Sequence, residues 1–415
     1  MKHAIKDIKL AVQGEKNLLW AAKEMPVLKE IEKDFLSKKP FKGINIAACL
    51  HITKETGVLL MLLRDGGANV SACGSNPLST QDDIAAILAK KGINIFAWRG
   101  TNNKEYYNNL NSALDIKPDI VIDDGADLIN TVHTTRKELL KKIIGGMEET
   151  TTGVIRLKAM HKDGALRFPV IAVNDSRTKH LFDNYYGTGQ STIDGVLRAT
   201  NIMLAGKQVV VAGYGDCGRG VAKVLRGLGS HVVVTEIDPV RALQAVMDGF
   251  RVQTMNQALP TTDIVITVTG NCDVITYDHV KLMKDNAIIC NSGHFNVEIA
   301  INEISKHAKT KVIRDNMVEY NFGKKSIYIL GEGRLINLAA AEGHPSAVMD
   351  MSFANQALGA AYLLQNQQDM EPGVYTVPQE LDDNIAALKL KSMNTMYDKL
   401  TKKQVHYLAS WQEGT

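Results

Sequence analysis

The sequence predicts an α/β protein built from two doubly wound parallel sheets and a small helical C-terminal segment. Two blocks of the chain alternate short β-branched runs with helical patterns, and this order is typical of parallel βαβ units. A long helical pattern over 190–205 separates the blocks. Further helical patterns follow at 352–365, 379–393 and 401–409, the last of them beginning with a capping threonine. The length of 415 residues agrees with two or three domains.

The first block, from about 43 to 173, carries candidate strands at 43–50, 68–73, 93–98, 119–123 and 169–173. Helical patterns such as 57–64 and 80–91 lie between them. The second block begins near Gly206 and carries candidate strands at 207–212, 231–235, 263–267, 286–291 and 326–330. Because doubly wound sheets bind ligands at the carboxyl ends of their strands, we expect one binding cleft between the two sheets.

The most specific pattern is the glycine-rich turn Gly-Tyr-Gly-Asp-Cys-Gly-Arg-Gly at 213–220, which lies between a strand and a helix. Gly213 and Gly215 allow a tight turn and a close approach to a pyrophosphate, whose charge is stabilised by the helix N-terminus. Gly218 lets the helix pack closely on the strand. Glu236 ends the next strand, where it can accept from ribose hydroxyls and repel a 2′-phosphate. The pattern predicts a Rossmann-like domain that binds NAD rather than NADP.

The composition argues against several classes of protein. The net charge is +3, from 48 basic and 45 acidic residues, and lacks the clustered basic excess that nucleic-acid binding requires. No apolar run approaches the ~20 residues of a membrane helix, and the first 16 residues lack the apolar core of a signal peptide. The five cysteines form no Cys-x-x-Cys pair, and no Cys/His spacing matches a zinc site. We expect a cytoplasmic enzyme with reduced thiols and no metal.

Polar side chains follow strands in both blocks. Each has an ordinary structural explanation: Asp123-Asp124-Gly125 is a common turn, and Lys179 and Asp183 could form a solvated helical pair. Together, however, they place carboxylates, histidines and a lysine at one predicted cleft. The candidate catalytic residues are His51, Asp124, Glu149, Lys179, Asp183 and His294.

These segments make the chain resemble the S-adenosyl-L-homocysteine hydrolase family from about residue 8 to the C-terminal region. The specific matches include 50–56, 79–82, 123–125, 148–153, 173–175, 179–184, 212–220, 235–239, 293–295, 332–334 and 343–345. The resemblance implies a substrate-binding domain (1–180 and 346–390), an NAD-binding domain (181–345) and a C-terminal oligomerisation segment (391–415). It also implies a cytoplasmic homotetramer with tightly bound NAD.

The resemblance further implies the reversible hydrolysis of S-adenosyl-L-homocysteine to adenosine and L-homocysteine. In the family, oxidation of the ribose 3′-hydroxyl to a ketone acidifies the 4′ proton. A base removes that proton, homocysteine is eliminated, water adds, and the stored hydride reduces the ketone again, so that no net redox change occurs.

Residue by residue, Lys179 and Asp183 are similar to the pair that assists deprotonation of the 3′-hydroxyl, and we expect burial near other cationic groups to depress the pKa of Lys179. Asp124 and His51 resemble acid–base groups near C4′ and C5′, and Glu149 resembles the carboxylate that holds the ribose hydroxyls. His294 and His344 resemble histidines near the 5′ end. The other implied substrate-binding residues are Thr53, Glu55 and Met349. The implied cofactor contacts are Thr150, Thr151, Thr152, Asn184, Gly213, Gly215, Asp216, Cys217, Gly218, Glu236, Arg241, Asn271, Asn337 and His344.

Some positions depart from the family pattern. Thr188 replaces a cysteine near the nicotinamide, Glu342 a methionine near the adenine, and Arg241 an asparagine near the cofactor's adenosine ribose. The last residues, 408–415, lack the Lys/Tyr-bearing tail that longer members extend into a neighbouring protomer's NAD site.

Three alternatives remain open. The first is a hydrolase of S-inosyl-L-homocysteine, for which Glu55 would accept from the N1–H of the base. The second is an NAD-dependent dehydrogenase with exchangeable cofactor, and the third is a nucleotide-sensing protein without turnover.

Overall fold

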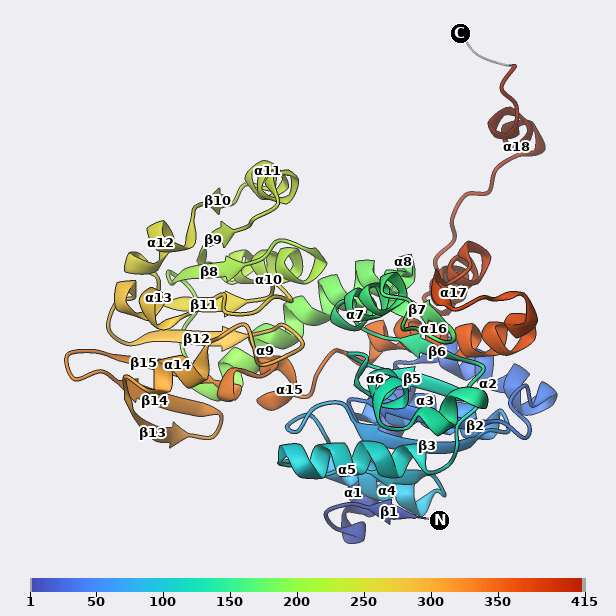
Figure 1. Ribbon diagram of the computed structural model, residues 1–415. Helices are drawn as coiled ribbons and strands as arrows, with labels where there is room; N and C mark the ends of the chain where they lie inside the picture. Colours follow the sequence, from blue (N-terminus) through green and yellow to red (C-terminus); the bar gives the residue numbers. More distant parts are fainter. Residues whose placement is uncertain (1, 413–415) are drawn as a thin grey trace.

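The computed structural model describes residues 2–412 and contains two lobes, each built on an eight-stranded sheet (Figure 1). The strand order is β1-β4-β3-β2-β5-β6-β7-β16 in the first sheet and β10-β9-β8-β11-β12-β15-β14-β13 in the second. Among the described residues the strands pair in parallel except along β14, which is antiparallel to both of its neighbours. The predicted fold, with two doubly wound sheets and a helical C-terminal segment, is confirmed.

The strands of the first sheet are β1 (His3–Ala4), β2 (Asn45–Leu50), β3 (Asn69–Gly74), β4 (Asn94–Phe96), β5 (Ile120–Asp123), β6 (Gly145–Glu148), β7 (Pro169–Ala172) and β16 (Gly373–Thr376). Its helices are α1 (Ala11–Lys23), α2 (Pro26–Lys38), α3 (Lys54–Asp65), α4 (Asp82–Lys90), α5 (Asn103–Leu114), α6 (Asp127–Thr134), α7 (Thr151–Lys162), α16 (Ser346–Asn366) and α17 (Gln379–Ser392). Two apolar cores lie on the opposite faces of the sheet, as expected where helices cover both faces.

The strands of the second sheet are β8 (Gln208–Ala212), β9 (His231–Thr235), β10 (Arg251–Val252), β11 (Ile264–Thr267), β12 (Ala287–Asn291), β13 (Lys309–Arg314), β14 (Met317–Asn321) and β15 (Ser326–Leu330). Its helices are α9 (Thr188–Thr200), α10 (Asp216–Gly227), α11 (Pro239–Met247), α12 (Met255–Ala258), α13 (Tyr277–Leu282), α14 (Ile301–Ser305) and α15 (Ile336–Ala339). Strand β6 of the first sheet and the β13–β14 hairpin of the second were not predicted from the sequence.

The chain crosses between the lobes twice. The first crossing runs from the short helix α8 (Arg177–Lys179) through the π-helix η4 (His180–Gly187) into α9. The second returns from α15 to α16, which packs into the core of the first sheet through Phe353, Ala357 and Leu363. Both crossings therefore lie beside the space between the sheets.

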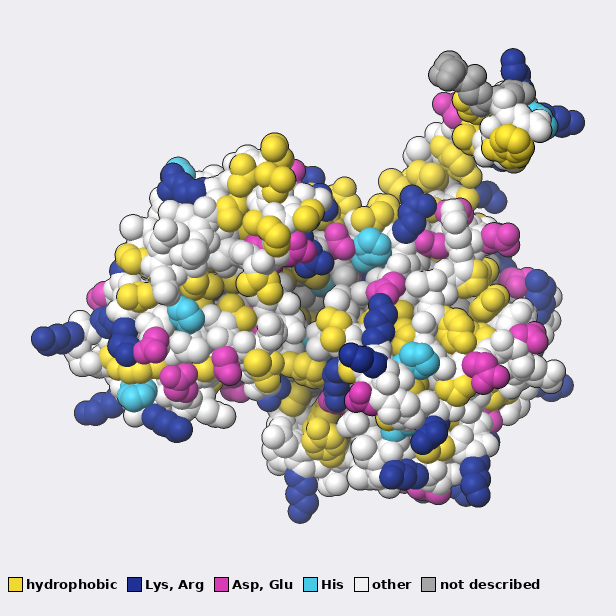
Figure 2. Space-filling view, turned by 45° about the horizontal axis from the view of Figure 1, so that its top comes forward, with side chains coloured by type: hydrophobic (Ala, Val, Ile, Leu, Met, Phe, Trp, Pro, Cys, Tyr) yellow, Lys and Arg dark blue, Asp and Glu magenta, His cyan; other side chains and the backbone are white. Residues whose placement is uncertain are grey.

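The C-terminal arm, residues 393–412, leaves the first lobe after α17 and ends in α18 (Lys402–Ala409) (Figure 1). Thr401 caps α18, as predicted, and accepts from Gln404 N at 3.3 Å. Figure 2 shows hydrophobic side chains along this arm, and Met396 and Trp411 are 96% and 90% exposed. Residues 413–415, the end of the predicted 391–415 segment, lie outside the described residues. No helix within 2–412 has the length and apolar character needed to cross a membrane.

Candidate active site

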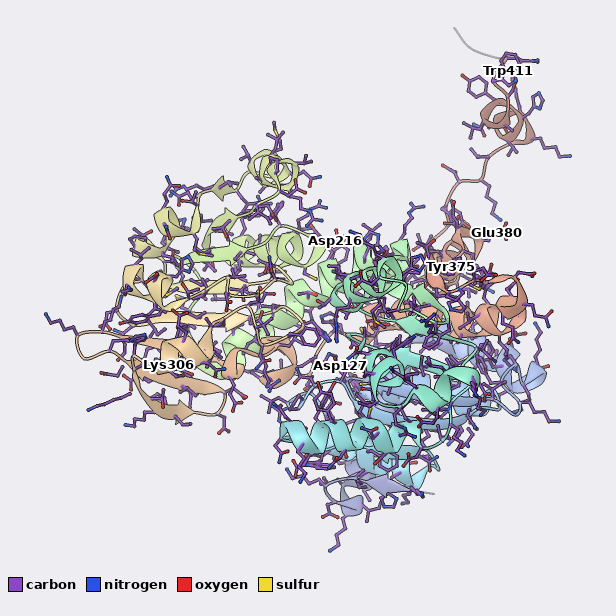
Figure 3. All side chains as sticks on the ribbon, in the orientation of Figure 1. Asp127, Asp216, Lys306, Tyr375, Glu380 and Trp411 are labelled. Carbon is purple, nitrogen blue, oxygen red and sulfur yellow. The ribbon has the colours of Figure 1, made fainter. Side chains whose placement is uncertain are left out.

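A cavity of about 1380 Å³ lies between the two lobes and is lined by loops at the carboxyl ends of both sheets. Figure 3 places Asp216 of the second lobe and Asp127 of the first at the boundary where the lobes meet. Pockets for a single small ligand are usually about 300–1,000 Å³. The cavity therefore has room for a large ligand and a smaller one side by side.

The second lobe supplies the glycine-rich turn predicted to bind a dinucleotide. Gly213 has a φ of +104°, which favours glycine, and Gly215 directly precedes α10. A Cβ on Gly218 would collide with the carbonyl oxygen of Gly213. Glu236 accepts from Tyr214 N at 2.6 Å and lines the cavity beside the turn. The helix N-terminus, the missing Cβ atoms and the carboxylate fit the pyrophosphate and ribose of NAD.

Asn337 adds a second observation that fits NAD. Its Nδ2 donates to Ser191 Oγ at 3.2 Å, whereas its Oδ1 is buried and has no hydrogen-bond partner within residues 2–412. Because Asn337 lines the cavity, this oxygen is free to accept from a carboxamide such as that of nicotinamide. The other predicted cofactor residues on the lining are Thr150, Thr151, Thr152, Asn184, Asp216, Cys217, Arg241, Asn271 and His344.

Lys179, the last residue of α8, lies at the centre of a buried polar cluster. Its Nζ is 2.7 Å from Asn184 Oδ1 and 3.0 Å from Asp183 Oδ2. Glu149 Oε1 lies 3.7 Å away from the same nitrogen. Since η4 carries Asp183 and Asn184, the crossing between the lobes places three of the predicted site residues together.

The pKa values in this cluster differ from the expectation for Lys179. Burial lowers the pKa of Lys179, but the carboxylates of Asp183 and Glu149 outweigh burial and hold the pKa above its ordinary value. Burial raises the pKa of Asp183, and the charges of Lys179 and His344 outweigh that effect and lower it. Burial raises the pKa of Glu149 to about 8 against the opposing charge of Lys179. The prediction of a depressed lysine pKa was wrong because carboxylates, not cations, surround the ammonium group.

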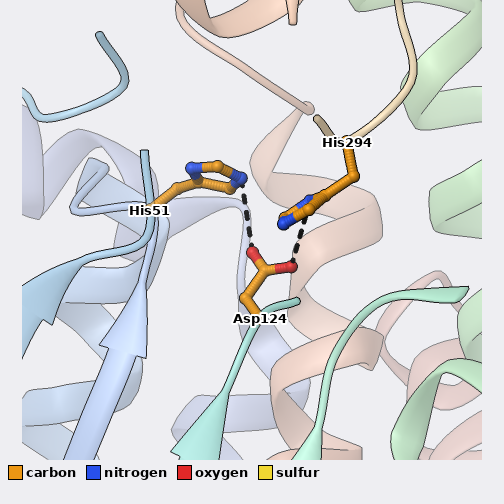
Figure 4. A group of neighbouring side chains, drawn as sticks. All are labelled: His51, Asp124 and His294. Carbon is orange, nitrogen blue, oxygen red and sulfur yellow. Dashed lines mark ion pairs between the residues drawn. The ribbon is translucent and has the colours of Figure 1, made fainter. Parts of the chain in front are cut away.

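His51, Asp124 and His294 form a second cluster (Figure 4), assembled from the ends of three strands. His51 Nε2 lies 3.3 Å from Asp124 Oδ2, and His294 Nδ1 lies 3.6 Å from Asp124 Oδ1. Nδ1 of His51 lies 2.8 Å from Ser79 Oγ and 3.1 Å from Ser75 Oγ, and a hydroxyl can donate to it. Because a carboxylate only accepts, the single proton of the neutral ring lies on Nε2, which donates to Asp124.

Burial lowers the pKa of His51 to about 4, so this histidine is neutral near pH 7. The cluster therefore offers a neutral base next to a carboxylate. Its three ligand atoms lie within 4.8 Å of one another, a spacing that could also hold a metal ion. Spacing along the sequence could not reveal this arrangement, because each residue follows a different strand.

His344 connects the two sides of the cavity. Its Nδ1 bonds to Asp183 Oδ1, and its Nε2 lies 3.3 Å from the hydroxyl of Thr188. The same hydroxyl lies 3.4 Å from the sulfur of Cys217, in the glycine-rich turn. Because the Thr188 hydroxyl donates to Cys217, its oxygen accepts from His344 Nε2. Both ring nitrogens of His344 then donate, Nδ1 to Asp183 and Nε2 to Thr188. A continuous hydrogen-bonded chain thus runs from the glycine-rich turn to the lysine cluster.

Thr53 and Met349 line the end of the cavity formed by the first lobe, whereas Glu55 lies outside the lining formed by the described residues. The Glu55 carboxylate accepts from Ser346 Oγ at 2.6 Å and lies 3.3 Å from Lys54 Nζ. Lys54 also reaches Glu342 at 2.9 Å. Both carboxylates were candidates from the sequence, but Lys54, which lies between them, was assigned no role.

Some residues that hold the catalytic candidates in place were not predicted from the sequence. Ser352 Oγ donates to Asp183 Oδ2 at 2.9 Å, and Gln356 Nε2 donates to Glu149 at 2.5 Å. Both residues belong to α16, whose sequence shows only helical periodicity. No local motif marks them, because their partners lie more than 160 residues away in the chain.

The fold and this site define an NAD-binding α/β enzyme in which the cofactor turn adjoins a buried proton-transfer cluster. A family model described as the NAD-binding domain of S-adenosyl-L-homocysteine hydrolase matches residues 184–343, and one described as S-adenosyl-L-homocysteine hydrolase matches residues 2–142. The chain belongs to the S-adenosyl-L-homocysteine hydrolase family. The family and the NAD-binding domain predicted from the sequence are thereby confirmed.

Relatives named for two different substrates resemble the whole chain. The S-inosyl-L-homocysteine hydrolase of Methanocaldococcus jannaschii is 58% identical over 414 residues, which cover 100% of both chains. The adenosylhomocysteinase of Saccharolobus solfataricus is 56% identical over 418 residues, again covering 100% of both. Among solved structures, a dipicolinate synthase chain from Bacillus halodurans has a TM-score of 0.50 at 14% identity, over 78% of this chain and 99% of that chain. That likeness concerns the fold alone.

Proposed function

We propose that the protein catalyses the reversible hydrolysis of S-adenosyl-L-homocysteine to adenosine and L-homocysteine. The observation that carries the proposal is the adjacency of a complete NAD turn and the Lys179 cluster in one cavity. When bound, NAD supplies a reversible hydride acceptor for the ribose 3′ carbon. A thioether hydrolysis needs this because the ketone acidifies the 4′ proton and makes elimination of the thiolate possible.

At the 3′ position, Lys179 acts as a cation that stabilises the developing alkoxide. Glu149 lies 3.7 Å from the Lys179 nitrogen, and its ionised form, which grows as the pH rises toward its pKa of about 8, takes the hydroxyl proton. Asp183 stays ionised and orients Lys179 from 3.0 Å. The three residues thus divide the work between charge stabilisation, proton transfer and positioning.

At the 4′ and 5′ positions, the His51–Asp124–His294 cluster transfers protons. His51 is neutral near pH 7 and donates from Nε2 to Asp124, whose carboxylate keeps free lone pairs and can accept the acidified 4′ proton. His294 lies on the opposite side of Asp124 and can protonate the leaving thiolate or position the incoming water. These assignments require the nucleoside to lie between Lys179 and the cluster.

A second substrate, S-inosyl-L-homocysteine, is favoured by one observation. Lys54 and Glu55 follow the lining residue Thr53 in the chain, so a base that reached past Thr53 would find a donor for the 6-oxo group of hypoxanthine in Lys54 and an acceptor for N1–H in Glu55. Adenine presents the opposite pattern, an amine donor and an N1 acceptor. Measuring kcat/KM for the adenosyl and inosyl substrates side by side decides between them, and a clear inosyl preference would overturn the adenosyl assignment.

Cofactor retention tests the hydrolase against a dehydrogenase. Protein denatured after purification should release about one NAD(H) per chain, because a recycled cofactor has no need to leave. The purified protein should also convert the thioether without added NAD. Protein that is free of NAD(H) and reduces added NAD in proportion to an oxidised alcohol would instead be a dehydrogenase. Binding of adenosine without product formation would indicate a sensor.

We further propose a cytoplasmic homotetramer with the domains at 1–180 and 346–390, at 181–345 and at 391–415. The C-terminal arm supports this proposal, because its apolar side chains are exposed on the single chain and soluble proteins usually bury such surfaces in interfaces. Sedimentation of the full chain, compared with a chain truncated after residue 393, tests the role of the arm. An unchanged mass per particle would show that the arm does not hold protomers together.

A further inference from the structure

Asp382, on α17, bonds to the residues that begin α8. Its buried carboxylate accepts from Ser176 Oγ at 2.7 Å, from Arg177 N at 2.8 Å and from Thr178 N at 3.0 Å. It also accepts from Thr178 Oγ1. The next residue along the chain is Lys179. A carboxylate about two hundred residues away in sequence therefore holds the helix that presents the central cation of the site.

This arrangement replaces a local helix cap. The first N–H groups of a helix lack partners within the helix and are usually satisfied by the side chain at the N-cap position. Ser176 occupies that position, but it makes no capping bond of its own and its hydroxyl donates to Asp382 instead. The start of α8 is thus held by tertiary structure.

The surrounding contacts make the attachment specific. Asn355, on α16, donates to Thr178 Oγ1 at 2.7 Å. Its Oδ1 lies 2.8 Å from Ser176 Oγ, so it shares with Asp382 the single proton of that hydroxyl. Burial raises the pKa of Asp382, but the hydrogen bonds from Thr178 and Ser176 outweigh it and lower the pKa. The carboxylate is therefore ionised and makes charge-assisted bonds, which are the strong kind.

The position of Lys179 depends on the start of α8 because the segment that follows the lysine has an unusual geometry. Lys179 is followed by the π-helix η4, a rare geometry that local propensity does not stabilise. Lys179 must nevertheless stay within 3.0 Å of Asp183 and 2.7 Å of Asn184 on that segment. The bonds from Asp382 to the start of α8 therefore fix the backbone position from which the Lys179 side chain extends.

We propose that Asp382 is a positioning residue for the 3′ chemistry, acting through the start of α8 on Lys179. The inference rests on the proposed function, because it concerns the step in which Lys179 acts. Among the described residues, Asp382 is not part of the cavity lining. Misplacing a catalytic group by about 1 Å can cost on the order of 10² in rate, so loss of this attachment should be visible in the kinetics.

Asp350 provides a matched control on the neighbouring helix. It is also a buried carboxylate, and it accepts from Val27 N at 3.1 Å and Leu28 N at 2.9 Å at the start of α2. It pairs with Lys389 of α17 at 2.9 Å. Asp350 belongs to α16, but its own bonds go to α2 and α17. Replacing it therefore breaks the same kind of contact to α17 and the same kind of cap at a helix start that no site residue follows, and it leaves the bonds of Ser352 to Asp183 and of Gln356 to Glu149 in place.

The experiment compares Asp382→Asn and Asp382→Ala with Asp350→Asn and Asp350→Ala in the NAD-loaded full-length protein. The readouts are the rate at which NADH absorbance appears on mixing with adenosine or inosine, the KM for the nucleoside, the NAD content and the unfolding temperature. We expect the Asp382 variants to slow the NADH signal at least about tenfold. KM and NAD content should stay within about twofold, since base and cofactor contacts remain. Asn, which keeps one acceptor oxygen, should slow the reaction less than Ala.

The Asp350 variants should lose comparable unfolding temperature while their NADH signal stays near the wild-type rate. If Asp382→Ala does not fold, Ser176→Ala tests the same attachment, because it removes one donor without changing α17. Wild-type rates in the Asp382 and Ser176 variants, or equal slowing by Asp350 variants of equal stability, would overturn the positioning role alone. Absence of an NADH signal from the wild-type protein with both nucleosides would instead overturn the proposed function, and the positioning role with it.

Discussion

Replacing Lys179 with methionine should have two separable effects, one on stability and one on rate. The side chain is 5% exposed and lies among the carboxylates of Asp183 and Glu149. Removing one partner of a buried ion pair typically costs about 3–5 kcal/mol. We expect a value near the lower end, about 3 kcal/mol, because Asp183 keeps its bond to His344 and Glu149 can take up a proton.

The rate should also fall in the molecules that remain folded, an effect that the loss of stability does not explain. Loss of one positioned group typically lowers a rate by about 10²–10⁴, which corresponds to roughly 3–5 kcal/mol of barrier. The half-reaction that produces NADH isolates this step, because it precedes elimination. We expect Lys179→Met to slow the NADH signal by that factor while the nucleoside still binds.

Lys389→Met is the matched control for this experiment. Lys389 pairs with buried Asp350 at 2.9 Å and its side chain is 14% exposed, but it lies outside the cavity lining of the described residues. It should lower stability by a similar mechanism and leave the half-reaction near the wild-type rate. A Lys179→Met enzyme with a wild-type half-reaction, or a Lys389→Met enzyme slowed to the same degree, would refute the assigned role of Lys179.

Three further predictions concern the cofactor turn and pH. Glu236→Ala should empty the site of tightly bound NAD, measured as nucleotide released on denaturation; full occupancy would contradict the ribose assignment. Gly218→Ala should also lower NAD content, because its Cβ would collide with the Gly213 carbonyl, whereas Gly227→Ala on the same helix meets no atom within 4 Å and should retain NAD. The stability that neutral His51 contributes is fully present above its ordinary pKa near 6.5 and is lost as pH falls toward about 4, by about 1.4 kcal/mol per pH unit. Chemical unfolding of wild type and His51→Gln across this range should show that difference, and parallel curves would refute it.

The parts of the fold that could be predicted are those whose short-range sequence pattern determines the local structure. The strands of the second sheet from β8 to β9, and the turn between them, combine a β-branched run, obligatory glycines and a terminal acid, and they lie where expected. The strand β6 was missed because two of its four residues are glycines, which weaken the strand signal. The strand β13 was missed because its side chains are exposed, so no alternation of apolar residues marks it.

In the candidate site too, contacts between residues close in sequence could be predicted, whereas contacts between distant helices could not. Lys179 and Asp183 are close in sequence, and their proximity followed from helical spacing. The partners that hold them, Ser352 and Asp382, come from distant helices and have no local signature. The error over the lysine pKa has the same origin, because the sign of the shift depends on which charges the fold brings near the ammonium group.

The π-helix η4 has a consequence for how such a site can be lost. A π-helix carries an additional residue in its turn compared with an α-helix. Deleting one of residues 185–187 would allow a regular helix to form from α8 into α9, while Lys179, Asp183 and Asn184 kept their spacing. Every later side chain would then turn by about 100° around the helix axis relative to Lys179. Thr188, the first residue of α9, would turn away from Cys217 and His344, and the hydrogen-bonded chain between the glycine-rich turn and the lysine cluster would break. Catalysis here therefore depends on chain length at one place as strictly as on residue identity.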